Sequence, residues 1–233
     1  MIPLRDDVPH HRAPVITIVI IAACAIVFLF ELALGDERQE VFLHLGGLVP
    51  ARYTNLNWAA WVGYPPSWLP FVSHMFLHGG WLHLLGNMWF LWLFGDNVED
   101  RLGRVRYPLF YLLCGLAAGL TQFFLTPGSK VPLIGASGAI SGVMGAYIVL
   151  YPRARILTVI PIFVFLQFIQ VPAFVFLGLW FIIQLQSGAL SLSAESASSG
   201  GVAFWAHVGG FITGIILLRL MAPARPPWIR RRA

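Results

Sequence analysis

Charged residues are scarce in this chain of 233 residues, of which they make up 11%, whereas soluble domains typically carry about 25%. Hydrophobic residues make up 58% of the chain, and the mean hydropathy is +0.76. A soluble protein of this length could not bury so much apolar surface. The composition therefore excludes a soluble enzyme and a disordered regulator, and it indicates an integral membrane protein.

Cysteine is scarce as well. The two cysteines, Cys24 and Cys114, both lie in apolar runs and offer neither a disulfide framework nor a paired metal-ligand spacing. The net charge is +5, but no basic stripe is interleaved with exposed aromatic residues, and so we expect no nucleic-acid partner. Basic residues that flank membrane spans and face anionic lipid explain this charge better.

Long apolar runs lie between the charged residues. A helix needs about 20 apolar residues to cross the hydrocarbon layer. The uncharged run 156–194 is too long for one span, because 39 helical residues would reach about 58 Å. Since Pro161 and Pro172 interrupt it, we interpret 156–171 as an interfacial or packed connection. The sequence thus predicts an all-α fold with six transmembrane helices, over 13–34, 77–95, 107–129, 131–152, 173–188 and 196–218.

The distribution of lysine and arginine predicts the orientation. With the N-terminus inside, the inner segments hold twelve of these residues and the outer loops hold only three, Arg38, Arg52 and Lys130. We therefore expect a cytoplasmic N-terminus over 1–12, a membrane domain over 13–222 and a basic cytoplasmic tail over 223–233. The outer loop 35–76 is rich in Trp and Tyr and is predicted to be partly embedded. The Ser- and Gly-rich loop 187–201 is predicted to be either a flap over a site or a slack connector.

Histidines mark the second apolar run, HMFLHGGWLHLLGN. His74 and His78 are four residues apart, as are His83 and Asn87, so that each pair shares one helical face. Polar groups inside a membrane are expensive and indicate function. Three interpretations remain open from the spacing alone: polar contacts between helices, catalysis or transport, and metal binding.

Two further polar residues lie among glycines. Ser137 stands in GASGAISG at the start of the fourth span, and His207 stands in AHVGGFITG near the start of the sixth. Glycine faces let helices approach closely, and so these two spans are natural partners. His83, Asn87, Ser137 and His207 all fall within about 5–15 Å of the outer surface. A shared site explains this common depth.

The chemistry that these residues permit is nucleophilic. A serine hydroxyl needs a neighbouring base, and His207 has the pKa range for that role. Spans four and six hold no acidic residue, so a Ser–His dyad is implied, with the orienting contact of the base unknown. The Asn87 amide, His83 and the Ser137 backbone N–H could stabilise an oxyanion.

The segments HGGWLHLLGNMWFLWLFG, GASGAISG and AHVGGFITG, in this order, resemble the rhomboid intramembrane serine proteases. Glu99 and Gly103 in VEDRLG also match the pattern. The resemblance covers about 70–222. It implies a six-helix bundle, Ser137 as nucleophile, His207 as general base, and His83 and Asn87 in the oxyanion hole.

The resemblance also implies single-span membrane proteins as substrates, a lateral substrate gate at span five and a flap at 187–201. It implies no cofactor and no metal. Some relatives carry an aromatic residue one turn after the nucleophile, where this chain has Ser141, so support for His207 must differ. We expect a serine endopeptidase in a plasma membrane, specifically a bacterial inner membrane, with the site near the outer face and an oligomeric state that is unknown. A transporter with a histidine relay and a non-catalytic binding protein are the rival functions.

Overall fold

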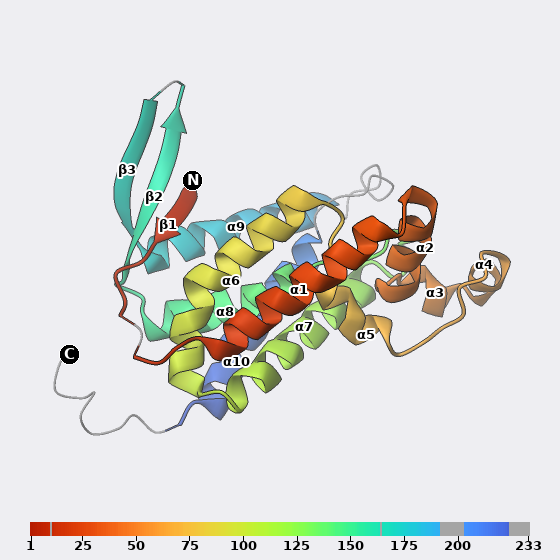
Figure 1. Ribbon diagram of the computed structural model, residues 1–233, viewed down its shortest axis with the longest axis horizontal. Coiled ribbons are helices and arrows are strands. Elements are labelled where there is room, and N and C mark those ends of the chain that lie inside the picture. Colours follow the sequence, from red (N-terminus) through yellow and green to blue (C-terminus); the bar gives the residue numbers. More distant parts are fainter. Residues whose placement is uncertain (10, 164, 192–202, 224–233) are drawn as a thin grey trace.

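The computed structural model describes residues 1–9, 11–163, 165–191 and 203–223. Helices dominate this part of the chain (Figure 1). The long ones are α1 (Val15–Ala33), α6 (Trp81–Leu102), α7 (Arg106–Leu125), α8 (Ser137–Leu150), α9 (Ala173–Ser191) and α10 (Phe204–Met221).

Four of the described helices, α1, α7, α9 and α10, are long and apolar enough to cross a membrane. By contrast, α6 carries Asp96, Glu99 and Asp100 in its last turns, and α8 has only 14 residues. The predicted count of six spans therefore remains a prediction, although the six long helices correspond one by one to the six predicted runs. The predicted sixth span began at 196, whereas residues 192–202 lie outside the described part, as do the flap residues among them and the tail from 224 onward.

The predicted outer loop 35–76 is built from short helices. They are α2 (Asp36–Gly46), α3 (Ala51–Thr54), α4 (Leu56–Trp61), α5 (Pro70–Ser73) and the 3-10 helix η1 (His74–Phe76). All of them lie at the end of the bundle where α1 ends (Figure 1). The short helix η1 packs into the bundle, because a side chain at Gly115 of α7 would collide with Met75.

The all-α prediction is wrong at one place. Strands β1 (Ile2–Arg5), β2 (Arg155–Ile162) and β3 (Phe165–Pro172) form an antiparallel sheet in the order β1-β2-β3. The strands β2 and β3 form a hairpin with register from Arg155↔Pro172 to Ile162↔Phe165. This segment is rich in Ile, Val and Phe, which favour strands, and Pro161 disfavours a helix. Its uncharged composition alone does not distinguish a strand from a connection.

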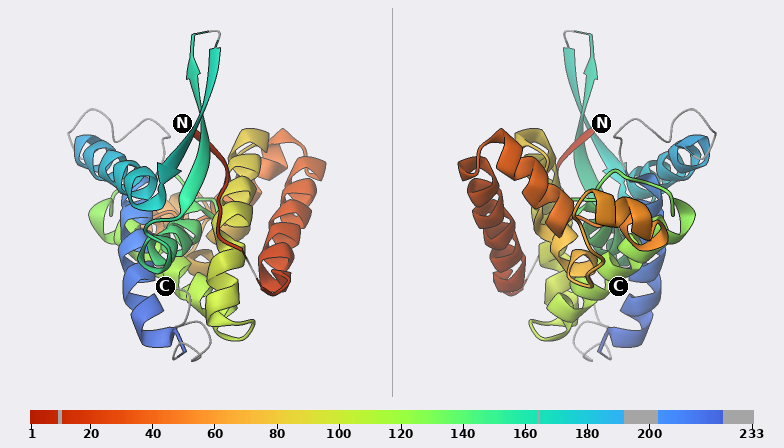
Figure 2. Two further views of the ribbon diagram at one scale, coloured as in Figure 1. Left: turned by 90° about the vertical axis from the view of Figure 1, so that its left-hand side faces the viewer. Right: turned by 90° about the vertical axis from the view of Figure 1, so that its right-hand side faces the viewer.

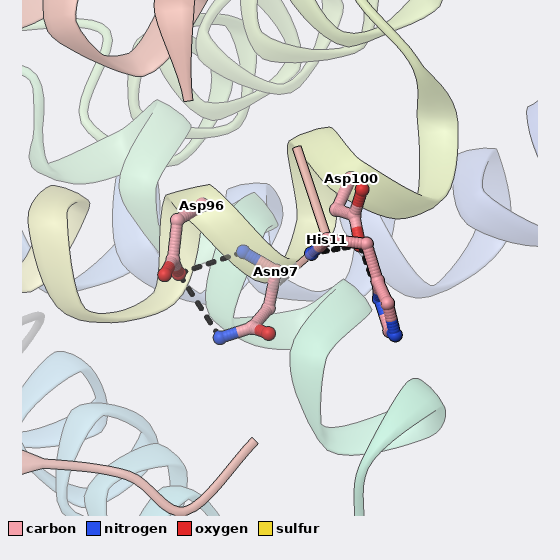
Figure 3. A network of polar contacts seen from close by, with 4 residues as sticks. All are labelled: His11, Asp96, Asn97 and Asp100. Atoms are coloured by element: carbon pink, nitrogen blue, oxygen red, sulfur yellow. Dashed lines mark hydrogen bonds and ion pairs between the residues drawn. The ribbon is translucent and has the colours of Figure 1, made fainter. Parts of the chain in front are cut away.

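The N-terminal segment is tied to the ends of the helices. The Asp6 carboxylate accepts hydrogen bonds from the Tyr147 hydroxyl of α8 and from Nδ2 of Asn97 on α6, the latter at 3.1 Å. Trp89 Nε1 on α6 donates to the carbonyl oxygen of Pro3 at 2.6 Å. Figure 3 shows two neighbouring contacts at the end of α6, between His11 and Asp100 and between Asp96 and Asn97. These contacts hold β1 against the bundle.

The helix α8 lies at the centre of the bundle, since every residue from 138 to 147 is buried. The backbones of α8 and α10 meet directly through their glycines. A Cβ atom at Gly210 would overlap the carbonyl oxygen of Gly138, and one at Gly214 would overlap that of Gly142. The predicted partnership of these two glycine faces is confirmed.

Candidate active site

Ser137 is the first residue of α8, and its side chain is half-buried. The chain reaches it through Gly135, whose φ of +113° lies in the region that favours glycine. The N-terminus of a helix carries a partial positive charge, which favours an anion formed beside it. The sequence therefore folds so that the hydroxyl stands at an electropositive helix end.

His207 lies in the first turn of α10 and faces Ser137 across the glycine contact. Its Nε2 atom is 2.8 Å from Ser137 Oγ. His207 is 8% exposed. Since the glycines allow the two backbones to touch, residues 70 positions apart in the chain come within hydrogen-bond distance.

The orienting contact of His207, which sequence reasoning did not find, comes from α9. The Oε1 atom of Gln184 is 2.8 Å from His207 Nδ1. An amide oxygen can only accept a hydrogen bond, so Nδ1 carries the proton and Nε2 is left to accept the proton of the serine. The cost of placing a glutamine in a spanning helix was a signal that could have identified Gln184.

Trp180, one turn before Gln184 on α9, supplies the aromatic contact. Its ring centroid is 5.8 Å from that of His207. The position one turn after Ser137 is occupied by Ser141, whose hydroxyl donates to the carbonyl oxygen of Ser137 at 2.6 Å. The aromatic ring next to the imidazole thus comes from α9 and not from α8.

His83 and Asn87 are brought to the same place by α6. A Cβ atom at Gly135 would lie 2.6 Å from His83 Nε2 and 3.4 Å from Asn87 Nδ2. Both side chains therefore border the glycine that leads into Ser137. The Nδ2 atom of Asn87 is buried, and within the described structure it has no hydrogen-bond partner. A buried donor without a partner is rare and requires an explanation.

The other two histidines have different surroundings. His74 is buried in η1, and its Nε2 atom lies 3.0 Å from a Cβ atom placed on Gly119 of α7. The backbone N–H of His78 donates to the Glu31 carboxylate of α1 at 3.3 Å, and its ring contacts that of His83. Among the described residues, no three His, Cys, Asp or Glu side chains are grouped as ligands of a metal ion would be.

Comparison with known proteins now places this geometry in a family. The model of the Rhomboid domain matches residues 65–224, which is more than half of the chain. The chain belongs to the rhomboid family. The matched region contains all four predicted site residues. Membership of the family also identifies the helical bundle as that of a multi-pass membrane protein related to proteases.

Curated rhomboid relatives come from several compartments. The chain is 28% identical to Rhomboid-like protein 11, chloroplastic, of Arabidopsis thaliana, over 67% of this chain and 54% of that protein. It is 30% identical to Rhomboid protein 1, mitochondrial, of Saccharomyces cerevisiae, over 66% and 42%. It is 36% identical to Rhomboid protease GluP of Bacillus subtilis, over 40% and 18%. The chain thus matches about half or less of the length of these rhomboid proteins.

Proposed function

We propose that this rhomboid-family chain is an intramembrane serine endopeptidase that uses a dyad of Ser137 and His207. The observation that carries the proposal is the distance of 2.8 Å between His207 Nε2 and Ser137 Oγ, and the contact of Gln184 Oε1 with Nδ1 favours the tautomer whose Nε2 accepts the serine proton. Membership of a family that includes bacterial rhomboid proteases supports it.

The first half of the reaction is acyl transfer. Ser137 Oγ attacks the carbonyl carbon of the scissile peptide bond while its proton moves to His207 Nε2. His207 then gives this proton to the leaving amine, and an acyl group remains on Ser137. Gln184 stabilises the imidazolium by accepting from Nδ1–H. In the second half, His207 removes a proton from water, which attacks the ester carbonyl carbon. His207 then returns this proton to Ser137 Oγ as the bond to the acyl group breaks and the carboxyl product leaves.

The oxyanion of each tetrahedral intermediate needs hydrogen-bond donors. We propose the Nδ2 group of Asn87, the His83 imidazole and the backbone N–H of Ser137. The buried and unpartnered Nδ2 atom of Asn87 supports this assignment, because a preorganised donor requires no rearrangement when the charge develops. Its loss would cost about 2.7–4 kcal/mol of transition-state stabilisation.

The substrates that we propose are single-span membrane proteins. Their transmembrane segments would be cut near the membrane face at which α8 begins, which the arginine distribution assigns to the outside. The proposed topology has a cytoplasmic segment over 1–12, a six-helix membrane domain over 13–222 and a basic cytoplasmic tail over 223–233. We propose a bacterial inner membrane as the location.

The test uses the purified full chain in liposomes with a fluorophosphonate probe and a model single-span substrate. Wild type, Ser137→Ala, His207→Ala and Ser141→Ala are compared, the last being a matched serine one turn along α8. We expect labelling and cleavage by wild type and by Ser141→Ala, and loss of both in the other two variants.

Two outcomes contradict the proposal. Cleavage that persists in Ser137→Ala shows that another group is the nucleophile. A folded wild type that binds the single-span substrate but neither labels with the probe nor cuts points to a non-catalytic binding protein.

A further inference from the structure

The hairpin of β2 and β3 projects out of the helical bundle, between α6 and α9 and obliquely to α1 (Figures 1 and 2). Its far part, residues 161–163 and 165–170, is here called the distal hairpin. Three phenylalanine side chains there are open: Phe163 is 99% exposed, Phe165 is 68% exposed and Phe168 is 60% exposed. The distal hairpin therefore presents an apolar surface that the described protein does not cover.

Both faces of the distal hairpin are open. Successive residues of a strand point to opposite faces, and every residue from Phe165 to Gln170 is exposed. Residues 156–172 contain no charged side chain. An isolated hairpin is at best marginally stable in water, and an exposed hydrophobic strand edge is prone to association. The amino-acid composition thus fits surroundings that are largely apolar.

The base of the hairpin lies at a level where a membrane has its headgroups. It follows the end of α8 that is opposite Ser137. The helix termini at this end of the bundle carry exposed arginines, which are Arg12, Arg104, Arg106, Arg153, Arg155 and Arg219. Arginines at the ends of spanning helices pair with anionic headgroups. The hairpin begins beside these arginines at Arg155, and the distal hairpin lies at its far end.

The open edge of β3 limits how deep the hairpin can lie. In the sheet order β1-β2-β3, no described strand pairs with the outer edge of β3, and β1 pairs with β2 only at Leu157, Thr158 and Val159, so that both edges of the distal hairpin are open. Unpaired backbone groups do not occur facing the hydrocarbon core, because each costs several kcal/mol. The polar side chains of Gln167 and Gln170 are also exposed on β3. Headgroups and their water can satisfy these groups, whereas acyl chains cannot.

We propose that the distal hairpin is a phospholipid-binding element that lies in the boundary between headgroups and acyl chains, in the leaflet opposite the Ser137–His207 pair. Its phenylalanines contact acyl chains on both faces, and its open strand edges contact headgroups and water. The contacts of β1 with β2 and of Pro3 with Trp89 hold the base of the hairpin to the bundle.

The experiment places an environment-sensitive fluorophore on the hairpin in the full chain. Phe165→Cys and Phe168→Cys, on opposite faces, are each labelled with a maleimide dye. Both native cysteines are 0% exposed, so the dye reacts with the introduced thiol. The labelled proteins are placed in phosphatidylcholine vesicles whose lipids carry bromine either close to the headgroup or near the chain end.

Two control positions calibrate the quenching. Ile182→Cys lies on α9 at a position that is 51% exposed and faces lipid in a spanning helix. Glu37→Cys lies on the charged and exposed surface of α2. We expect both hairpin dyes to be quenched by bromine near the headgroup at least as strongly as the Ile182 dye, and several-fold more than by bromine near the chain end. The Glu37 dye should respond to iodide in water instead.

Each other outcome overturns the proposal. Quenching of the hairpin dyes by aqueous iodide alone means that the hairpin extends into water. Protection from both bromine and iodide means that protein covers it, either a second copy of the chain or a substrate segment. Stronger quenching by bromine near the chain end means that the hairpin lies deep in the hydrocarbon.

Discussion

At the scale of single residues, α9 holds the imidazole of His207 from two sides. Gln184 accepts a hydrogen bond from Nδ1, and the Trp180 ring lies against the imidazole. A neutral amide in this place fixes the tautomer without placing a second charge in an apolar bundle, where an unpaired carboxylate would be expensive. Under the proposed mechanism, the amide strengthens its contact with His207 when the imidazolium forms, because a hydrogen bond to a charged group is stronger than a neutral one.

Gln184→Leu therefore lowers kcat. Loss of a hydrogen bond to a charged group costs about 1.5–3 kcal/mol, which is roughly a 10- to 150-fold reduction. The measurement is cleavage of a single-span substrate in liposomes. Gln186→Leu, two residues along α9 and exposed, is the matched control and should retain the wild-type rate. Equal rates for the two variants would remove Gln184 from the proposed mechanism.

Residue types and their spacing sufficed to predict Ser137, His207, His83 and Asn87 as one cluster, because polar groups in apolar runs are few and conspicuous. Gln184 was not predicted, although it is polar and lies in an apolar run, because its spacing on α9 has no relation to the spacing on α8 or α10. Only the packing of α9 against α10 decides which face of α9 meets His207.

At the scale of elements, the N-terminus of α1 is capped by another helix. The residue before α1 is Pro14, which provides no side-chain cap. Instead, Glu99 of α6 accepts from the backbone N–H of Ile16 at 2.9 Å and from that of Thr17 at 2.8 Å. Its carboxylate also accepts from the Thr17 hydroxyl at 2.9 Å. The first-turn donors of α1 are thus satisfied by a negative charge, which helix N-termini favour.

Glu99→Gln should lower the free energy of unfolding by about 1–3 kcal/mol, since the charge is lost and one oxygen becomes a donor facing donors. Thermal unfolding in detergent measures the effect. Glu37→Gln on the exposed surface of α2 is the control, for which a change within about 0.5 kcal/mol is expected. If the free energy of unfolding falls by the same small amount in both variants, Glu99 does not cap α1 in the way inferred here.

The contact between α8 and α10 gives a second prediction at this scale. Gly214→Ala places a methyl group onto the carbonyl oxygen of Gly142, and such overpacking typically costs about 1–3 kcal/mol. Gly178→Ala on α9 is the control, because a Cβ atom there meets nothing within 4 Å. It should be neutral or more stable by up to about 1 kcal/mol. The unfolding temperatures of the two variants in detergent show whether the close contact of α8 with α10 or the low helix propensity of glycine determines the effect.

The order and type of the long helices could be predicted from uncharged runs, whereas the sheet could not. Residues 156–171 were assigned correctly as a connection but without strands. The hairpin of β2 and β3 was missed because an uncharged run alone does not distinguish a strand from a connection. The strand β1 comes from the first residues of the chain and pairs with β2 more than 150 residues later. No local pattern reports a pairing over that distance.

At the scale of the whole molecule, Asp6 joins the N-terminus to two helices. Its carboxylate contacts Tyr147 of α8 and Asn97 of α6. Burial raises the pKa of Asp6 above its ordinary value of 3.8. The folded protein therefore holds this proton more tightly than the unfolded chain does. The stability that the proton contributes is complete below pH 3.8 and is lost as the pH rises through the raised pKa.

Asp6→Asn should consequently remove a pH dependence. The side chain of the variant stays neutral at every pH. Its unfolding temperature should therefore rise relative to that of wild type as the pH is raised from 3.8 towards neutrality. Paired thermal scans in detergent across that range measure this difference. Glu37→Gln, on the exposed surface of α2, is the control and should track wild type. A constant difference between Asp6→Asn and wild type would contradict the assignment.

The shortness of α8 has a consequence for hydration. Its 14 residues extend about 21 Å, whereas the hydrocarbon layer is about 30 Å thick. The neighbouring helices enclose α8. The part of the hydrocarbon thickness that α8 does not span therefore lies inside the protein and not at its lipid-facing surface. Under the proposed mechanism, a hydrolytic water therefore crosses only about 9 Å of the membrane thickness to reach Ser137. The bilayer around the molecule can keep its full thickness while the reaction proceeds.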